Sequence, residues 1–276
     1  MEAEKKRGVS AAVLKWTAVI SMLIDHMTAV GFLTWYWPMR RLRRLTPVIT
    51  PVSRWSYYIL RGVGRLAFPI YCFLLVEGYF HTRNVKKYLV RLGLFALISE
   101  IPFDRAFDQV WFKWDSQNVF FTLFLGLLAV WLVDLLCKNL SERPGWQRPV
   151  RVLLALAAAF ACMAAADWMH TDYGWSGVTL ILVMYLLRRW ELPRLICSAL
   201  ALLPVGQSIP DFCHTLFSGS FTVGFSGGIE MVGLPVFALL HFYNGERGRQ
   251  AKYFFYVFYP AHLALLALIR YLFIRA

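Results

Sequence analysis

A carboxylate and an imidazole stand next to each other in the first long apolar run, as Asp25 and His26 within residues 9–33. An imidazole exchanges a proton near neutral pH, so the chemistry to expect is proton handling. Asp costs about 2.5–3.5 kcal/mol at the centre of a membrane helix, and such residues usually face a cavity and serve function. Helix neighbours point about 100° apart, so we expect one side chain to face the bundle interior and the other to find a partner on a second helix. The alternative is that both serve only packing or folding.

Further polar residues interrupt later apolar runs. Glu77 and His81 are four residues apart, so they can touch on one face of a helix. The pair 117–118 (Gln-Asn) opens another run, where it would cap the helix or reach a ligand. His262 is a second imidazole in an apolar run, and together with His26 it indicates a cavity that handles protons.

The composition assigns the chain to the membrane proteins. Of its 276 residues, 59% are hydrophobic and only 16% are charged, and the mean hydropathy is +0.53. A soluble domain has about a quarter of its residues charged. The net charge of +13 lies in short loops, where it orients helices, so we expect no nucleic-acid partner. The five cysteines lack metal-ligand spacing, so we expect buried thiols and no metal.

The elements that must position these residues are membrane helices of about 20 apolar residues each. The chain predicts an all-α polytopic membrane protein, one domain over 1–276, with roughly nine (8–10) transmembrane helices around a polar mid-membrane cavity. Gly62 and Gly64 would let helices approach closely. The predicted spans are 10–33, 62–82, 88–107, 117–137, 149–168, 174–190, 193–210, 226–243 and 252–273.

The distribution of Lys and Arg predicts an orientation. The basic residues at 5–7 precede the first span, which indicates a cytoplasmic N-terminus. Counting from there, the inner loops collect basic residues, and the outer loops after the fifth and seventh spans contain none. The basic loop at about 35–61 disagrees, since this count places it outside.

Motifs of soluble enzymes are missing from the chain. We find no nucleophile elbow, no phosphate-binding loop, no zinc-binding helix and no repeated half-helices typical of inverted-repeat transporters. The residues by themselves therefore predict a helical bundle with a buried polar cavity and a basic inner face.

Short segments along nearly the whole chain resemble the TraX family. They lie at 14–16, 22–26, 64–70, 75–78, 81–84, 99–104, 117–122, 243–248, 255–256 and 259–262. The basic insert at about 35–61 departs from the family pattern. The family is named for the conjugation protein that acetylates the amino terminus of F-type pilin, and it resembles wider multi-helix acyltransferases. The resemblance therefore implies an acetyl-CoA-dependent acetyltransferase in the bacterial inner membrane.

On this resemblance, His26 is the general base that removes a proton from the acceptor as it attacks the thioester. Asp25, Glu77 or Glu100 would orient its ring. Asn118 or Arg65 would stabilise the oxyanion. The resemblance adds Tyr256 and His262 to the acceptor-binding or orienting residues.

The resemblance also implies that cations on the inner side meet the phosphates of acetyl-CoA. These cations are Arg83, Lys86, Lys87, Arg91 and Lys252. The alternative is that many of them only satisfy the positive-inside rule.

Two rival functions and several acceptors fit the same residues. Intramembrane Asp, Glu and His also suit a proton-coupled transporter or channel, and a non-catalytic membrane partner of a secretion apparatus would need none of them. The acceptor is a peptide amine such as a pilin-like N-terminus, a glycan hydroxyl or a small molecule. The remaining expected partner is the lipid bilayer itself.

Overall fold

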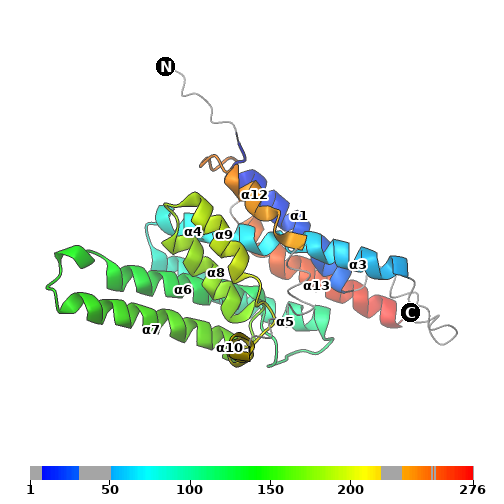
Figure 1. The fold of residues 1–276 in the computed structure, drawn as a ribbon. Coiled ribbons are helices and arrows are strands. Elements are labelled where there is room, and N and C mark those ends of the chain that lie inside the picture. Colours follow the sequence, from blue (N-terminus) through cyan, green and yellow to red (C-terminus); the bar gives the residue numbers. More distant parts are fainter. Residues whose placement is uncertain (1–7, 31–50, 219–231, 250, 252, 276) are drawn as a thin grey trace, which may run out of the picture. The chain divides into compact units, whose positions relative to one another are not determined.

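A computed structural model describes residues 8–30, 51–218, 232–249, 251 and 253–275 (Figure 1). Within these ranges the chain is helical, with two isolated β-bridges and no strand. The helices are α1 (Ala11–Ala29), α3 (Pro51–Gly64), α4 (Ala67–His81), α5 (Val85–Phe107), α6 (Val119–Cys137), η1 (Leu140–Glu142), α7 (Gln147–Trp168), α8 (Gly174–Leu186), α9 (Glu191–Ala201), α10 (Ile209–Ser218), α12 (Val236–His241) and α13 (Phe254–Arg275).

The chain forms two compact units. Unit 1 comprises residues 1–71, 101–111 and 228–276, and unit 2 comprises 72–100 and 112–227. Helices α4 and α5 are each divided between the two units. That all of these residues form one membrane domain stays a prediction.

In unit 1, the start of α1 is tied to the turn that follows α12. The backbone N–H of Val9 donates to the carbonyl of Phe242 over 2.8 Å, and the N–H of Asn244 donates to Val9 over 3.1 Å. The side chain of Ser10 accepts from the N–H of Val13 and so caps α1. The N-terminal end of α1 and the turn at 243–248 therefore lie together.

Helix α3 corrects the prediction that residues 35–61 form a loop. It begins at Pro51, because proline suits the first helical turn, whereas 31–50 fall outside the described residues. The helical backbone then breaks at Arg65 and Leu66 before α4 begins. The N–H of Leu66 donates to Val63 over 3.2 Å, a tightened last turn that ends α3.

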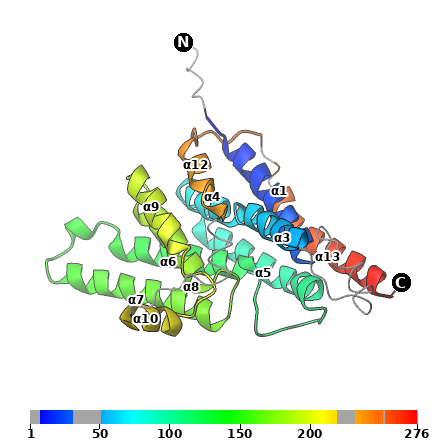
Figure 2. The same ribbon diagram turned by 45° about the vertical axis from the view of Figure 1, so that its right-hand side comes forward.

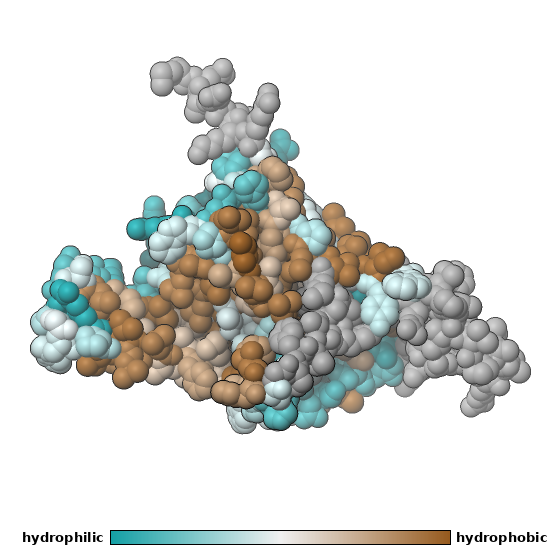
Figure 3. Space-filling view, in the orientation of Figure 1, coloured by the Kyte–Doolittle hydropathy of each residue, from teal (hydrophilic) through white to brown (hydrophobic). Residues whose placement is uncertain are grey.

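In unit 2, helices α6, α7 and α8 pack as consecutive antiparallel neighbours. The views in Figures 1 and 2 agree that α6 and α7 run side by side. A Cβ at Gly126 of α6 would lie 2.2 Å from Cδ1 of Ile181, so only glycine lets α8 pack this closely. Figure 3 shows apolar side chains along α6 and α7 and hydrophilic ones at the tip where the two are joined, the pattern of a hairpin that crosses a bilayer.

The predicted count of about nine spans is not confirmed. In the described part of the chain, four segments are long and apolar enough to cross a membrane: Trp55–His81, Val119–Glu142, Gln147–Trp168 and Phe254–Leu272. Helix α8 is apolar but short. The predicted span at 193–210 holds the short α9, which ends before Pro204 and Gly206. Of the predicted span at 226–243 the structure describes 232–243, which holds the short α12. Hydropathy counts apolar side chains but does not register the residues that end a helix.

Candidate functional site

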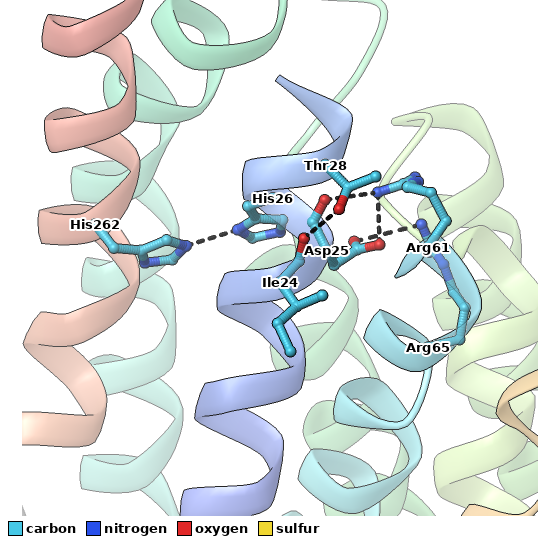
Figure 4. Close-up of polar contacts among 7 residues, drawn as sticks. All are labelled: Ile24, Asp25, His26, Thr28, Arg61, Arg65 and His262. Carbon is cyan, nitrogen blue, oxygen red and sulfur yellow. Dashed lines mark hydrogen bonds and ion pairs between the residues drawn. The ribbon is translucent and has the colours of Figure 1, made fainter. Parts of the chain in front are cut away.

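The carboxylate of Asp25 is bound by two arginines (Figure 4). Its Oδ1 lies 2.7 Å from Nη1 of Arg61, and its Oδ2 lies 3.5 Å from Nη2 of Arg65. The three side chains are 11%, 18% and 11% exposed, respectively, so this ion cluster is largely removed from solvent. One carboxylate and two guanidinium groups leave the trio with a net positive charge.

Gly64 makes this approach between α1 and α3 possible. A Cβ at this position would lie 2.2 Å from Cβ of Asp25 and 2.5 Å from its Oδ1, which is closer than non-bonded atoms approach in proteins. Arg61 lies in the last turn of α3 and Arg65 directly follows the helix, so both guanidinium groups reach Asp25 from the C-terminal end of α3. The close approach predicted at Gly64 is confirmed.

The imidazole of His26 faces another helix, α13. Its Nδ1 lies 2.6 Å from Nε2 of His262, and the two rings stack within 5° of parallel (Figure 4). Nδ1 of His262 in turn lies 2.7 Å from the carbonyl oxygen of Phe258. A carbonyl only accepts, so in the neutral pair Nδ1 of His262 carries a hydrogen and its Nε2 is the acceptor. Nδ1 of His26 is then the donor, which leaves Nε2 of His26 with its lone pair.

Aromatic rings surround this histidine pair. Phe107 and Tyr259 meet the His26 ring edge-on, with centroids 5.4 Å and 5.8 Å away. Phe258 stacks on His262 at 4.6 Å. Both imidazoles are buried, so packing on several sides holds each ring in its orientation.

Asp25 and His26 therefore diverge, as their helical spacing predicts, but each has a partner on a helix of its own. Asp25 meets α3, and His26 meets α13. The carboxylate that we expected to orient the imidazole is occupied by guanidinium groups, and His262 is the residue that holds the ring.

In unit 2, Glu100 and Asn118 form a second buried polar pair. Nδ2 of Asn118 donates to Oε2 of Glu100 over 2.5 Å and to the carbonyl of Ala96 over 2.8 Å. Its Oδ1 accepts from the N–H of Phe120 over 3.0 Å, which makes Asn118 the N-cap of α6. Of the two roles that we left open for this asparagine, the structure assigns the cap.

Glu77 pairs with a residue that we did not predict. Its Oε1 lies 3.2 Å from Nε of Arg188, which follows α8. The predicted contact between Glu77 and His81 does occur, but Nδ1 of His81 lies 2.7 Å from the backbone carbonyl of Glu77 rather than from its carboxylate.

Asp134 in α6 is a polar residue that sequence reasoning missed. Its Oδ2 accepts from the hydroxyl of Tyr79 in α4 over 2.8 Å, and its Oδ1 accepts from the hydroxyl of Tyr185 in α8 over 2.7 Å. The signal was present, because Asp134 is an acidic residue inside a predicted span.

Comparison with known proteins identifies the family. The model of the TraX protein family matches residues 10–270. The chain belongs to the TraX family. It is 34% identical over 271 residues to the probable fimbrial assembly protein FimC, serogroup H1, of Dichelobacter nodosus, and the match covers 93% of this chain and 94% of that protein. No solved structure matches the chain.

In this TraX-family chain, the predicted site residues fall into two sets. Unit 1 brings Asp25, Arg65, His26 and His262 onto neighbouring helices, and it adds Arg61, which we did not predict. The sequence feature that could have identified Arg61 is its position one helical turn before Arg65. Tyr256 also belongs to unit 1, as a half-buried residue of α13.

The other predicted residues of this TraX chain belong to unit 2. They are Glu77, Glu100, Asn118, Arg83, Lys86, Lys87 and Arg91. The first three basic residues are exposed around the N-terminal turn of α5, and Nε of Arg91 donates to the carbonyl of Lys87 over 3.3 Å. Lys252 lies outside the described residues.

Proposed function

We propose that this chain is an integral-membrane acetyltransferase that moves an acetyl group from acetyl-CoA to an amine or hydroxyl acceptor. The hydrogen-bond order in the histidine pair carries this proposal. The carbonyl of Phe258 accepts from His262, and His262 accepts from His26, so the remaining nitrogen of His26 is unprotonated. An unprotonated, buried and oriented imidazole nitrogen is what a general base requires.

The reaction follows from this nitrogen. The acceptor nitrogen or oxygen attacks the thioester carbonyl carbon while Nε2 of His26 takes its proton. The new bond to carbon forms, the bond between carbon and sulfur breaks, and the thiolate of coenzyme A leaves. His26 then returns the proton to the thiolate. A positioned general base contributes about 10²–10⁴-fold to such a step.

The ion cluster beside His26 supports the same chemistry. Arg61 and Arg65 share the carboxylate of Asp25, and their net positive charge is largely shielded from water. Positive charge that is already in place stabilises the oxyanion of the tetrahedral intermediate without reorganisation. Asp25 would act by fixing the two guanidinium groups, and only indirectly on the imidazole.

The donor and the acceptor are proposed from charge and from the relative. Arg83, Lys86 and Lys87 gather around the N-terminal turn of α5, where cations and helix N–H groups together suit phosphates such as those of acetyl-CoA. Arg91 of the same helix extends this basic set, and Lys252, which lies outside the described residues, is proposed from its charge alone. The relative from Dichelobacter nodosus carries the description of a fimbrial assembly protein, which favours a pilin-like amino terminus as acceptor over a glycan hydroxyl.

The proposed setting is the bacterial inner membrane, with the N-terminus in the cytoplasm. Acetyl-CoA would enter from the inside and the acceptor from the outer leaflet. A polar cavity that reaches the middle of the bilayer from both sides would then let the acetyl group cross without a carrier.

The test is hydrolysis and binding of acetyl-CoA by the detergent-purified chain. We expect slow thioester turnover in the wild type and a loss of about 10²-fold or more in His26→Ala, with acetyl-CoA binding retained. His214→Ala is the matched control, since it removes an exposed imidazole of α10. Full turnover in His26→Ala would refute the role of His26.

The same measurement distinguishes the rival transporter or channel. An enzyme turns over acetyl-CoA in detergent, whereas a transporter needs a sealed compartment and a gradient. If millimolar acetyl-CoA neither binds nor reacts, the acetyltransferase proposal fails, and proton flux into liposomes becomes the next measurement.

A further inference from the structure

In unit 2, the C-terminal ends of three helices meet at one partly buried carboxylate. Asp134 of α6 accepts from Tyr79 of α4 and from Tyr185 of α8, and the two phenol rings meet edge-on at 5.9 Å. All three residues lie in the last turns of their helices. The connections that follow these helices therefore lie at one end of unit 2.

This network extends outward to Arg188. The ring of Tyr185 stacks on Phe80 with a centroid distance of 5.7 Å and an angle of 12°. The guanidinium carbon of Arg188 lies 4.0 Å from the centroid of Phe80, and its Nε lies 3.2 Å from Oε1 of Glu77. The guanidinium plane is thus held on two sides, by an aromatic ring and by a carboxylate.

The contact with Glu77 leaves the outer edge of the Arg188 guanidinium group accessible to a ligand. Glu77 meets Nε, whereas the two terminal Nη nitrogens form the edge that matches two oxygens of a phosphate. The Arg188 side chain is 39% exposed, so solutes can reach it, whereas Glu77 beneath it is only 16% exposed.

Two other arginines at this end of unit 2, Arg148 and Arg151, differ from Arg188 because they bind backbone carbonyls. Arg151 donates to the carbonyl of Leu136 over 2.8 Å, and Arg148 donates to the carbonyls of Ser141 and Arg143. Those guanidinium groups satisfy backbone carbonyls around the end of α6.

Further positive charge surrounds Arg188. Nη1 of Arg194 lies 3.4 Å from the carbonyl of Arg188, and its guanidinium lies over the ring of Phe73. Arg189 is exposed beside them. Glu77 and Glu191 both act on Arg194. Three arginines, Arg188, Arg189 and Arg194, thus lie with these two carboxylates, and the excess positive charge favours an anion.

We propose that Arg188, oriented by Glu77 and by the stack from Phe80 to Asp134, is a phosphate-recognising arginine. The shared chemistry is a phosphate group with two oxygens that meet the Nη edge. Its source is either the nucleotide part of the acetyl-CoA donor, which rests on the proposed function, or the headgroup of an anionic phospholipid.

The experiment measures binding of coenzyme A to the detergent-purified full chain by calorimetry, with phosphate-free pantetheine as the reference compound. We expect Arg188→Ala and Arg188→Lys each to weaken coenzyme A binding about tenfold, because Lys keeps the charge but not the fork, and to leave pantetheine unaffected. Arg143→Ala is the matched control: it removes an exposed cation from the connection after α6, and coenzyme A affinity should not change.

A second variant separates orientation from simple charge. Glu77→Gln removes a negative charge next to Arg188, so charge alone predicts tighter binding of coenzyme A. If the carboxylate orients the guanidinium, binding instead weakens several-fold. Tighter binding in this variant would overturn the orienting role.

A comparison in lipid nanodiscs identifies the source of the phosphate. The wild type and Arg188→Ala are compared in nanodiscs of phosphatidylglycerol and of phosphatidylcholine by thermal unfolding. If the wild type does not bind coenzyme A but gains stability from phosphatidylglycerol only when Arg188 is present, the phosphate site stands and the acetyl-CoA proposal fails. If the wild type binds coenzyme A and the Arg188 variants bind it equally well, the phosphate site is refuted and the proposed function stands. No dependence on Arg188 with either ligand also refutes the site.

Discussion

The imidazoles of His26 and His262 are separated by 236 residues in the chain and by 2.6 Å between Nδ1 and Nε2. This contact holds a single hydrogen between the two rings. Because Nδ1 of His262 donates its hydrogen to the carbonyl of Phe258, Nε2 of His262 is the acceptor and the shared hydrogen is on Nδ1 of His26. A backbone group of α13 thus sets the protonation pattern of a side chain on α1. His262 is therefore a positioning residue for the proposed base.

Replacing His262 tests this relationship directly. In His262→Ala, His26 loses the acceptor that holds its Nδ1–H, so we expect kcat for acetyl-CoA turnover to fall by about 10²-fold with KM little changed. His262→Gln offers an oxygen acceptor and should recover part of the rate. The dependence of kcat on pH should also change in the alanine variant. Full activity with an unchanged pH profile would show that His262 only fills space.

Asp25→Asn should destabilise the protein. The change leaves Arg61 and Arg65 largely buried beside a neutral amide, and removing one partner of a buried ion pair costs about 3–5 kcal/mol. The measurement is thermal unfolding in detergent, where we expect a clear fall in Tm. The control is Asp115→Asn, at an exposed position between α5 and α6, which should leave Tm nearly unchanged. Equal Tm values for the two variants would mean that the carboxylate does not hold the cluster together.

Gly64→Ala should be poorly tolerated, because its Cβ would lie 2.2 Å from Cβ of Asp25 and force α3 away from α1. The matched variant is Gly93→Ala in α5, where the added Cβ would meet Phe124 at an ordinary distance of 3.6 Å. Alanine gains about 0.5–1 kcal/mol over glycine inside a helix, so Gly93→Ala should keep or raise Tm. A similar loss of Tm in both variants would contradict the close approach at Gly64.

Asn118→Ala should lower the free energy of unfolding by more than the loss of a helix cap alone would. Asn118 caps α6 and also donates to the buried carboxylate of Glu100. Asn84 accepts from the N–H of Lys87 at the start of α5 and is exposed, so Asn84→Ala reports a cap alone, about 1 kcal/mol. The excess in Asn118→Ala measures the support for Glu100, for which we expect about 1–3 kcal/mol. If unfolding shows equal losses, Glu100 does not depend on Asn118.

Some of these features follow from the local sequence. Apolar runs of membrane length indicate helices that cross a bilayer, because each backbone polar group must be satisfied within its own segment. Asp25 and His26 must diverge, because residues in sequence are about 100° apart on a helix. The place of Asn118 directly before an apolar run made a helix cap one of its two predicted roles, and the motifs along the chain identify the family.

The tertiary structure decided which helices meet. Nothing in the sequence pairs Asp25 with Arg61 or His26 with His262, because side-chain spacing describes the face of one helix and not the neighbour that covers it. The same limit hid Asp134, whose two phenol partners come from helices on either side of it in the chain. It also explains why the described residues do not confirm the count of about nine spans: hydropathy sums apolar side chains over a window, whereas a helix ends wherever its backbone hydrogen bonds find other partners. Local periodicity thus determined the candidates for the site, and packing between distant helices determined the partners.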